Sequence, residues 1–232
     1  MFENIKLHEF NSRLFNNKSA KIISDLLILK SLNKTLNVAL SGGNTPIPIL
    51  SDLLKTNTQW DKISFFQVDE RFVNEFSDGS NFKSLKECFY NKINSDFFPM
   101  ISDYISIDNS VFNYNKIIEE IVPKSTNGIP EFDLILLGVG FDGHTASLFK
   151  GHNEQRDISN VHKVFIKENQ YPVRITMNFS LINNSKKTVL LVKGNERSSM
   201  IKNMMKNPDN YTEFPIMKIL KNSKKLIIIL EK

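Results

Sequence analysis

Six short runs of apolar and β-branched residues constrain the fold of this chain more than any other feature. Most are nearly continuous in apolar residues instead of alternating with polar ones, which is typical of parallel strands buried on both faces. We therefore expect a sheet that is covered on both sides. The runs are Asn37–Leu40, Ile63–Val68, Phe132–Leu137, Lys163–Ile166, Thr188–Val192 and Leu226–Leu230.

Stretches with helical spacing separate these runs. Apolar residues three or four positions apart lie on one face of a helix. Alternation of strand and helix predicts an α/β fold, namely a doubly wound, mostly parallel sheet with helices on both faces, of the Rossmann-like kind. The spaced residues are Ile22, Leu26 and Leu29; Ile47, Leu50 and Leu54; Leu85, Cys88 and Phe89; and Met200, Met204 and Met205.

The 232 residues suffice for one α/β domain with a large core. No long linker rich in Gly, Ser or Pro divides the chain, so we expect a single domain over residues 1–232. Segment 123–131 is expected to be a loop leading into a strand, and segment 150–160 a polar surface loop. The single cysteine, Cys88, cannot form an intrachain disulfide, and its apolar helical context indicates a core residue.

The charge of the chain favours a small anionic substrate over a nucleic acid. Its net charge is +5, but the basic residues are spread along the chain and no dense basic cluster interleaved with aromatic residues occurs. We expect no nucleic-acid partner. No apolar run is long enough for a bilayer and the first residues lack a signal-peptide pattern, so we also expect no membrane partner and a cytoplasmic location.

Three polar loops follow predicted strands, and ligands of open α/β sheets bind where strands end. The first loop follows Leu40 and precedes a helical pattern that begins near Pro46. Its glycines let backbone approach a ligand, and the free N–H groups of the helix start suit a phosphate. An ordinary strand-to-helix turn is the alternative interpretation. The loop consists of Ser41, Gly42, Gly43, Asn44 and Thr45.

The second loop, Asp69-Glu70-Arg71-Phe72-Val73, follows the run that ends at Val68. It places two acids and an arginine at the carboxyl end of a strand, over the crevice that the first loop is also expected to border. An arginine there can hold a phosphate or a carboxylate, or stabilise a developing oxyanion. A surface cluster of salt bridges is the alternative.

The third loop, 138–145, contains Gly140, Asp142, Gly143 and His144. A histidine is suited to general-base catalysis near neutral pH, and a nearby carboxylate fixes its tautomer. The loop also matches the G-x-G-x-x-G dinucleotide fingerprint. A histidine directly after the third glycine disfavours that interpretation, and the next acid, Glu154, lies in a polar segment instead of at the end of a second strand.

Together these loops resemble the 6-phosphogluconolactonase family, within the glucosamine/galactosamine-6-phosphate isomerase superfamily. The related deaminases carry a tyrosine at the position of Arg71 and a different, acidic continuation after His144, so the resemblance favours the lactonases. Two positions depart from the family pattern: Lys150 replaces a proline and Arg197 replaces a lysine. The matching segments are LSGGNTP at 40–46, VDERFV at 68–73 with Ser80-Asn81, LLGVGFDGHTASLF at 136–149, Arg174–Met177 and Gly194–Arg197.

The resemblance implies hydrolysis of 6-phospho-D-glucono-1,5-lactone in the oxidative pentose phosphate pathway, without metal or cofactor. His144 is then the general base, Asp142 orients it, and Arg71 stabilises the oxyanion. A deaminase or isomerase of the same fold and a non-catalytic sugar-phosphate-binding effector module remain alternatives, and both a monomer and a homodimer remain open. The implied substrate-binding residues are Ser41, Gly42, Gly43, Asn44, Thr45, Asp69, Gly140, Gly143, Arg174 and Arg197.

Overall fold

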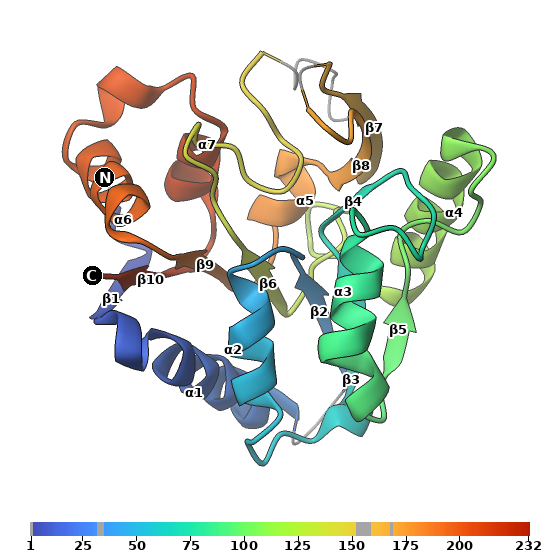
Figure 1. Ribbon diagram of the computed structural model, residues 1–232, viewed down its shortest axis with the longest axis horizontal. Helices are drawn as coiled ribbons and strands as arrows, with labels where there is room; N and C mark the ends of the chain where they lie inside the picture. The colour runs from blue at the N-terminus through green and yellow to red at the C-terminus, as the bar shows by residue number, and fades with distance from the viewer. Residues whose placement is uncertain (1, 32–34, 152–158, 168) are drawn as a thin grey trace.

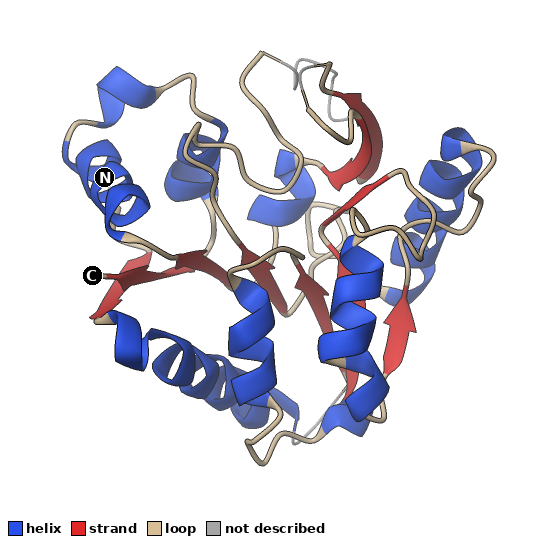
Figure 2. Cartoon of the chain, in the orientation of Figure 1, coloured by secondary structure: helices blue, strands red, loops and turns tan. Residues whose placement is uncertain are grey.

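The computed structural model describes residues 2–31, 35–151, 159–167 and 169–232. A seven-stranded sheet crosses the molecule, and every neighbouring pair of its strands is parallel (Figures 1 and 2). This confirms the predicted parallel sheet. In spatial order the strands are β1 (Ile5–Phe10), β10 (Leu226–Glu231), β9 (Thr188–Val192), β6 (Leu134–Leu137), β2 (Leu36–Leu40), β3 (Ile63–Gln67) and β5 (Asp96–Phe98).

Helices cover both faces of this sheet, as predicted (Figure 2). One face carries α1 (Ser12–Ser31), α2 (Pro46–Leu53) and α3 (Asn81–Cys88). The other carries α4 (Ile107–Ile121), α5 (Phe179–Asn183), α6 (Asn195–Lys206) and α7 (Pro215–Asn222). Short 3₁₀ turns lie at Trp60–Lys62, Tyr90–Lys92 and Pro208–Tyr211.

The predicted helical patterns fall on α1, α2, α3 and α6. The side chain of Leu29 lies outside the described residues. Cys88 ends α3 half-buried, against the core on that face, and burial raises the pKa of its thiol to about 11. It is therefore a residue at the border of the core with little reactive thiolate at neutral pH.

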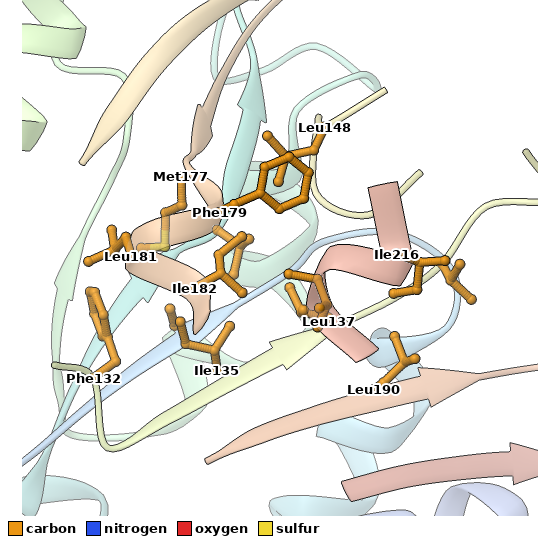
Figure 3. Packing of buried hydrophobic residues seen from close by; sticks show 14 of the residues in the cluster. Phe132, Ile135, Leu137, Leu148, Met177, Phe179, Leu181, Ile182, Leu190 and Ile216 are labelled. Atoms are coloured by element: carbon orange, nitrogen blue, oxygen red, sulfur yellow. The ribbon is translucent and has the colours of Figure 1, made fainter. Parts of the chain in front are cut away.

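Alternation along the buried strands explains why a two-sided core forms. Val38 and Leu40 of β2 belong to the cluster under α1–α3, whereas Ala39 between them belongs to the opposite cluster. Successive side chains of a strand point to opposite faces, so each apolar run contributes to both cores. In the second core, Leu137 of β6 and Ile216 of α7 belong to the same cluster of buried residues (Figure 3).

A second, antiparallel sheet lies beyond the carboxyl end of the main one, with strand order β4 (Asp69–Arg71), β8 (Val173–Met177), β7 (Val161–Phe165). Two expectations were wrong here. The run at 163–166 is not a parallel strand of the main sheet: it overlaps β7, an edge strand of which only Val161 and Val164 are buried. Segment 69–71 is not a loop, because it pairs with β8.

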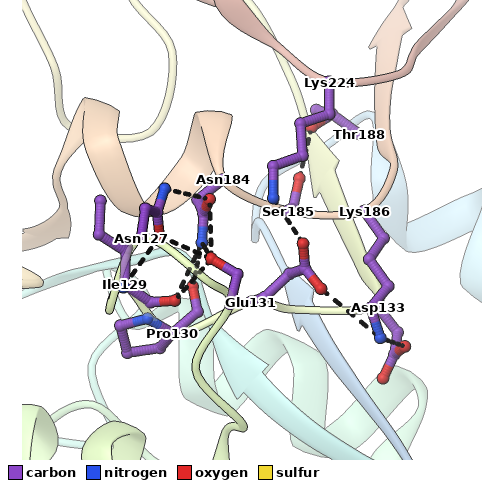
Figure 4. A network of polar contacts seen from close by, with 11 residues as sticks. Asn127, Ile129, Pro130, Glu131, Asp133, Asn184, Ser185, Lys186, Thr188 and Lys224 are labelled. Atoms are coloured by element: carbon purple, nitrogen blue, oxygen red, sulfur yellow. Dashed lines mark hydrogen bonds and ion pairs between the residues drawn. The ribbon is translucent and has the colours of Figure 1, made fainter.

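A network of polar contacts joins the segments at the amino-terminal ends of the strands (Figure 4). Asn184 donates to the backbone oxygen of Pro130 at 3.1 Å, and Lys186 pairs with the buried Asp133 at 2.9 Å. Segment 123–131 is indeed a loop that leads towards β6, closed by a bridge between Lys124 and Pro130. These contacts are at the opposite end of the strands from the loops with polar sequence motifs, so we assign them a structural role.

Strand order also fixes where a ligand can bind. From β2 the chain proceeds to β3 and β5 on one side, whereas from β6 it proceeds to β9 and β10 on the other. The direction of winding therefore reverses between β2 and β6, and the loops that follow these strands border the crevice that such a reversal leaves.

Candidate active site

A pocket of about 720 Å³ occupies this crevice. Its lining combines all three predicted loops with residues of β8 and α6. Asp142 and Gly143 are predicted site residues that do not line it; both lie in the turn beside His144. The predicted residues that line the pocket are Ser41, Gly42, Gly43, Asn44, Thr45, Asp69, Arg71, Gly140, His144, Arg174 and Arg197.

Asp142 and His144 form a hydrogen-bonded pair. Nδ1 of His144 lies 2.5 Å from Oδ1 of Asp142, and the backbone N–H of His144 donates to the same oxygen at 3.2 Å. Burial raises the pKa of Asp142, but the hydrogen bonds and charge of His144 outweigh it, so the pKa is below its ordinary value. Asp142 is thus ionised at neutral pH and holds Nδ1, which leaves Nε2 as the ring nitrogen for proton transfer.

The turn accommodates this pair because residue 140 is a glycine. A Cβ on Gly140 would lie 2.3 Å from Nδ1 and Cε1 of His144 and 2.6 Å from Oδ1 of Asp142. Gly143 is needed for another reason: its φ is +73°, and a Cβ there would lie 2.4 Å from Phe214. Both glycines therefore serve the backbone geometry that brings acid and base together.

The ring of His144 also stacks on Phe149, with centroids 4.3 Å apart and planes at 23°. Phe149 in turn lies under the guanidinium of Arg174, with 5.5 Å from Cζ to the ring centroid. The sequence motif included Phe149 without assigning it a role. Its contacts place it between the base and an arginine of the small sheet.

Arg71 and Arg174 are cross-strand partners in β4 and β8. Like charges so placed repel each other, which an anionic ligand or a carboxylate relieves. Burial lowers the pKa of Arg174, and the charge of Asp69 partly offsets this effect. Asp69 itself accepts a hydrogen bond at 2.6 Å from the buried Ser147, a residue that the sequence analysis did not select as a binding residue.

The two arginines differ in how their donors are used. Arg174 donates from Nε to Tyr171 at 3.0 Å, from Nη2 to Asn169 at 2.7 Å and from Nη1 to Ser147 at 3.4 Å. Arg71 donates from Nη1 to the backbone oxygen of Gly79 at 2.7 Å, but its buried Nε has no partner in the described part of the chain. Arg71 therefore retains a donor for a ligand.

The loop at 41–45 has the features of an anion site. The Oγ of Ser41 is buried and has no hydrogen-bond partner among the residues that the structure describes. Gly43 has a φ of +92°, and α2 begins after Thr45 without a side-chain cap. Pro46 and Pro48 have no backbone N–H, so Ile47 is the one residue among the first three of α2 that offers an N–H donor to an anion, fewer than the sequence analysis expected.

Arg197 reaches the pocket from the first turn of α6, and its guanidinium lies over the ring of Phe141 at 4.4 Å. Lys193, just before this helix, also lines the pocket and was missed by the sequence analysis. It directly follows the run Thr188–Val192, so the rule that ligands bind at strand ends was sufficient to find it.

Glu70 is not the crevice residue that we expected. Its buried carboxylate accepts hydrogen bonds from the backbone N–H groups of Asn81 at 2.8 Å and Phe82 at 2.6 Å, at the start of α3. It does not line the pocket. The alternative interpretation, a surface cluster of salt bridges, is also wrong for Glu70. This residue is buried, and its partners are mainly backbone amides.

Part of the predicted surface loop, residues 152–158 with Glu154, lies outside the described residues. Lys150, just before it, forms an ion pair with Glu213 ahead of α7. Within the described part of the chain, no group of His, Cys, Asp and Glu is arranged to hold a metal ion. Nor does any helix there have the length and apolar character to cross a bilayer.

A doubly wound parallel sheet with a cationic, glycine-lined pocket and an Asp–His pair at its switch point defines the class of this protein, an α/β protein with a positively charged crevice at the carboxyl ends of its strands. The particular family follows from comparison with known proteins. The chain belongs to the family described as glucosamine-6-phosphate isomerases/6-phosphogluconolactonase, whose model matches residues 11–228.

Named relatives agree with this family. The 6-phosphogluconolactonase of Thermotoga maritima is 30% identical over 172 residues, which cover 73% of this chain and 74% of the relative. The probable 6-phosphogluconolactonase of Dictyostelium discoideum is 30% identical over 216 residues and 89% of each chain. The solved structure of 6-phosphogluconolactonase from Trypanosoma cruzi has a TM-score of 0.85 at 27% identity, covering 100% of this chain and 96% of that one.

Proposed function

We propose that this protein hydrolyses 6-phospho-D-glucono-1,5-lactone to 6-phospho-D-gluconate, a step of the oxidative pentose phosphate pathway. The observation that carries the proposal is the Asp142–His144 pair, bonded at 2.5 Å at the wall of a pocket that three arginines also line. The names of the relatives support the lactone as substrate.

The phosphate group is assigned to the loop Ser41–Thr45 and to Arg197. The N–H of Ile47 in the uncapped first turn of α2 and the Oγ of Ser41, which has no partner within the described residues, offer donors to an anion. Arg197 makes no hydrogen bond or ion pair within the described residues, so its guanidinium is available. Arg174, whose donors are already used, supports the pocket wall and raises the positive potential around the substrate.

The reaction then proceeds through one tetrahedral intermediate. Nε2 of His144 accepts a proton from water while the water oxygen attacks C1 of the lactone, and Asp142 stabilises the imidazolium through Nδ1–H. We assign the oxyanion that forms on the carbonyl oxygen to the guanidinium of Arg71, which lines the pocket and whose Nε has no partner within the described residues. Collapse breaks the bond from C1 to the ring oxygen, which takes the proton from His144. A lactone is already an activated ester, so the scheme needs neither metal nor cofactor.

Two alternatives are separable from this function. A deaminase of the same family releases ammonia from glucosamine 6-phosphate, which an assay detects directly. A non-catalytic sugar-phosphate-binding effector module has no hydrolytic turnover. Binding of the phosphosugar without hydrolysis is the result that would favour this module.

The proposal extends to the setting of the enzyme. A small sugar phosphate is its partner, nucleic acid is not, and the cytoplasm is the expected location. These points rest on the spread of basic residues and on the substrate itself. Either a monomer or a homodimer is compatible with a pocket built from one chain.

Substitution of His144 by Asn tests the general base. We expect kcat for the phosphorylated lactone to fall at least a hundredfold, since general-base catalysis contributes roughly 10²–10⁴ in rate. Hydrolysis is followed by acid release and corrected for spontaneous opening of the lactone. The matched control is His8→Asn in the edge strand β1, which should retain wild-type turnover.

Two results would contradict the proposal. Turnover of His144→Asn close to that of the wild type would remove the histidine from the mechanism. Ammonia release from glucosamine 6-phosphate by the wild type, without lactone hydrolysis, would instead assign the chain to the deaminases.

A further inference from the structure

Phe141 is an exposed aromatic residue in the turn that carries the Asp142–His144 pair. Its side chain is 63% exposed, so core packing does not explain it. Its ring faces the guanidinium of Arg197, with 4.4 Å from Cζ to the ring centroid. That distance is well inside the range in which a cation is attracted to the face of an aromatic ring.

The ring of Phe141 is the aromatic group that the Arg197 guanidinium contacts. Within the described residues Arg197 has no hydrogen-bonded or ion-paired partner, and its Nε is buried and unpartnered. Arg174, in contrast, is fixed by three hydrogen bonds from its own guanidinium. An arginine held only by its stem loses much rotamer freedom when it binds a ligand, and that loss weakens binding.

The backbone beside Arg197 favours the same placement. Gly194 begins α6 with a φ of +97°, and a Cβ built there would lie 4.0 Å from Nη2 of Arg197. The guanidinium therefore lies back over the start of its own helix, between Gly194 and Phe141. It meets the pocket next to Lys193, which also lines it.

We propose that Phe141 is a positioning residue that holds Arg197 ready to bind the phosphate of the substrate. This inference rests on the proposed function, since it takes the substrate to carry a phosphate that Arg197 contacts. Phe141 itself touches neither the phosphate nor the reacting carbonyl. It lowers the entropy lost on binding because the guanidinium is already placed by the cation–π contact.

A positioning role of Phe141 predicts that its substitution changes the affinity for the substrate and not the rate of the catalytic step. Removal of the ring should raise KM for the phosphorylated lactone, and Kd for 6-phosphogluconate, by about three- to fivefold, the ratio expected for a cation–π contact at an exposed site. The kcat should stay within about twofold of the wild type, because Asp142 and His144 remain in place.

Three substitutions at position 141 separate the contribution of the aromatic ring face to binding from that of the apolar volume. Phe141→Leu keeps apolar volume but has no π face, Phe141→Ala removes both, and Phe141→Tyr keeps the face. We expect Leu and Ala to weaken binding of 6-phosphogluconate, measured by calorimetry, and Tyr to restore wild-type affinity. Phe112→Leu, at a 69% exposed position on α4, is the matched control and should change nothing.

The decisive measurement repeats Phe141→Leu in an Arg197→Ala background. If the ring acts through Arg197, Phe141→Leu causes no further loss of affinity in a protein that already carries Arg197→Ala. An equal loss in both backgrounds, wild-type affinity of Phe141→Leu, or a fall in kcat at constant KM would each overturn the role of Phe141. Lack of lactone hydrolysis by the wild type would instead overturn the proposed function, and this role with it.

Discussion

At the scale of single residues, the site depends on the lack of a side chain at Gly140 as much as on the reactive side chains. The hydrogen bond between Asp142 and His144 crosses directly over the backbone of Gly140. Gly140 does not need the left-handed backbone conformation that glycine favours, unlike Gly143. Its requirement is therefore steric: the space for a Cβ is already occupied by the imidazole.

Gly140→Ala should consequently displace the histidine without breaking the turn. We expect kcat to fall by about a hundredfold, the effect that a misplacement near 1 Å has on a catalytic group. Gly138→Ala, in the same turn, is the comparison, because a Cβ there meets nothing within 4 Å. Steady-state rates of the two variants decide the point, and equal rates would show that the close approach at Gly140 does not matter.

At the scale of elements, one buried carboxylate joins β4 to α3. Glu70 accepts hydrogen bonds from the first N–H groups of α3 and from Gln67 and Arg71. Burial raises the pKa of Glu70 above its ordinary value, and these hydrogen bonds offset part of that rise. The helix start is thus satisfied by an acid from a neighbouring strand, and the same contact fixes the backbone of Arg71.

Glu70→Gln should destabilise this junction. An amide NH₂ would face backbone donors where an oxygen now accepts, and leaving buried donors unsatisfied costs about 1–3 kcal/mol. We expect the free energy of unfolding in urea to fall by about 2 kcal/mol. The control is Glu87→Gln on the exposed side of α3, and an equal stability of the two variants would contradict the capping role.

At the scale of the whole molecule, the winding of the sheet brings together segments that are far apart in sequence. The loop after β2 and the loop after β6 meet because the winding reverses between these strands. Their backbones are joined directly, since the N–H of Ser41 donates to the oxygen of Leu136 at 3.1 Å. A ligand in this crevice contacts both halves of the sheet, so its binding energy stabilises the entire fold.

The product 6-phosphogluconate should therefore raise the melting temperature. At a concentration about 100 times its Kd, a ligand stabilises the native state by roughly 2.7 kcal/mol. For a chain of this size that corresponds to an increase of about 5–10 °C in a calorimetric scan. Gluconate, which lacks the phosphate, should have a much smaller effect. Equal shifts with the two compounds would argue against a phosphate site in the pocket.

The sequence by itself determined that the sheet is parallel, five of its seven strands, four of the seven α-helices that the structure describes and the loops that contain the site. Those features follow from local burial patterns and from polar residues at strand ends, both of which are readable along the chain. It did not predict the strands β1 and β5 or the helices α4, α5 and α7. The strand at 161–165 was assigned to the wrong sheet because its edge position depends on a partner, β8, and not on its own composition.

Only the tertiary structure decided what the charged residues do. Arg174 and Arg197 have the same chemistry, yet one donates to three neighbours and the other faces an aromatic ring. Glu70, expected in the crevice, is a buried helix cap. The physical reason is that the role of a polar side chain depends on its hydrogen-bond and ion-pair partners in the folded chain. Those partners come from segments that the sequence alone does not place beside it.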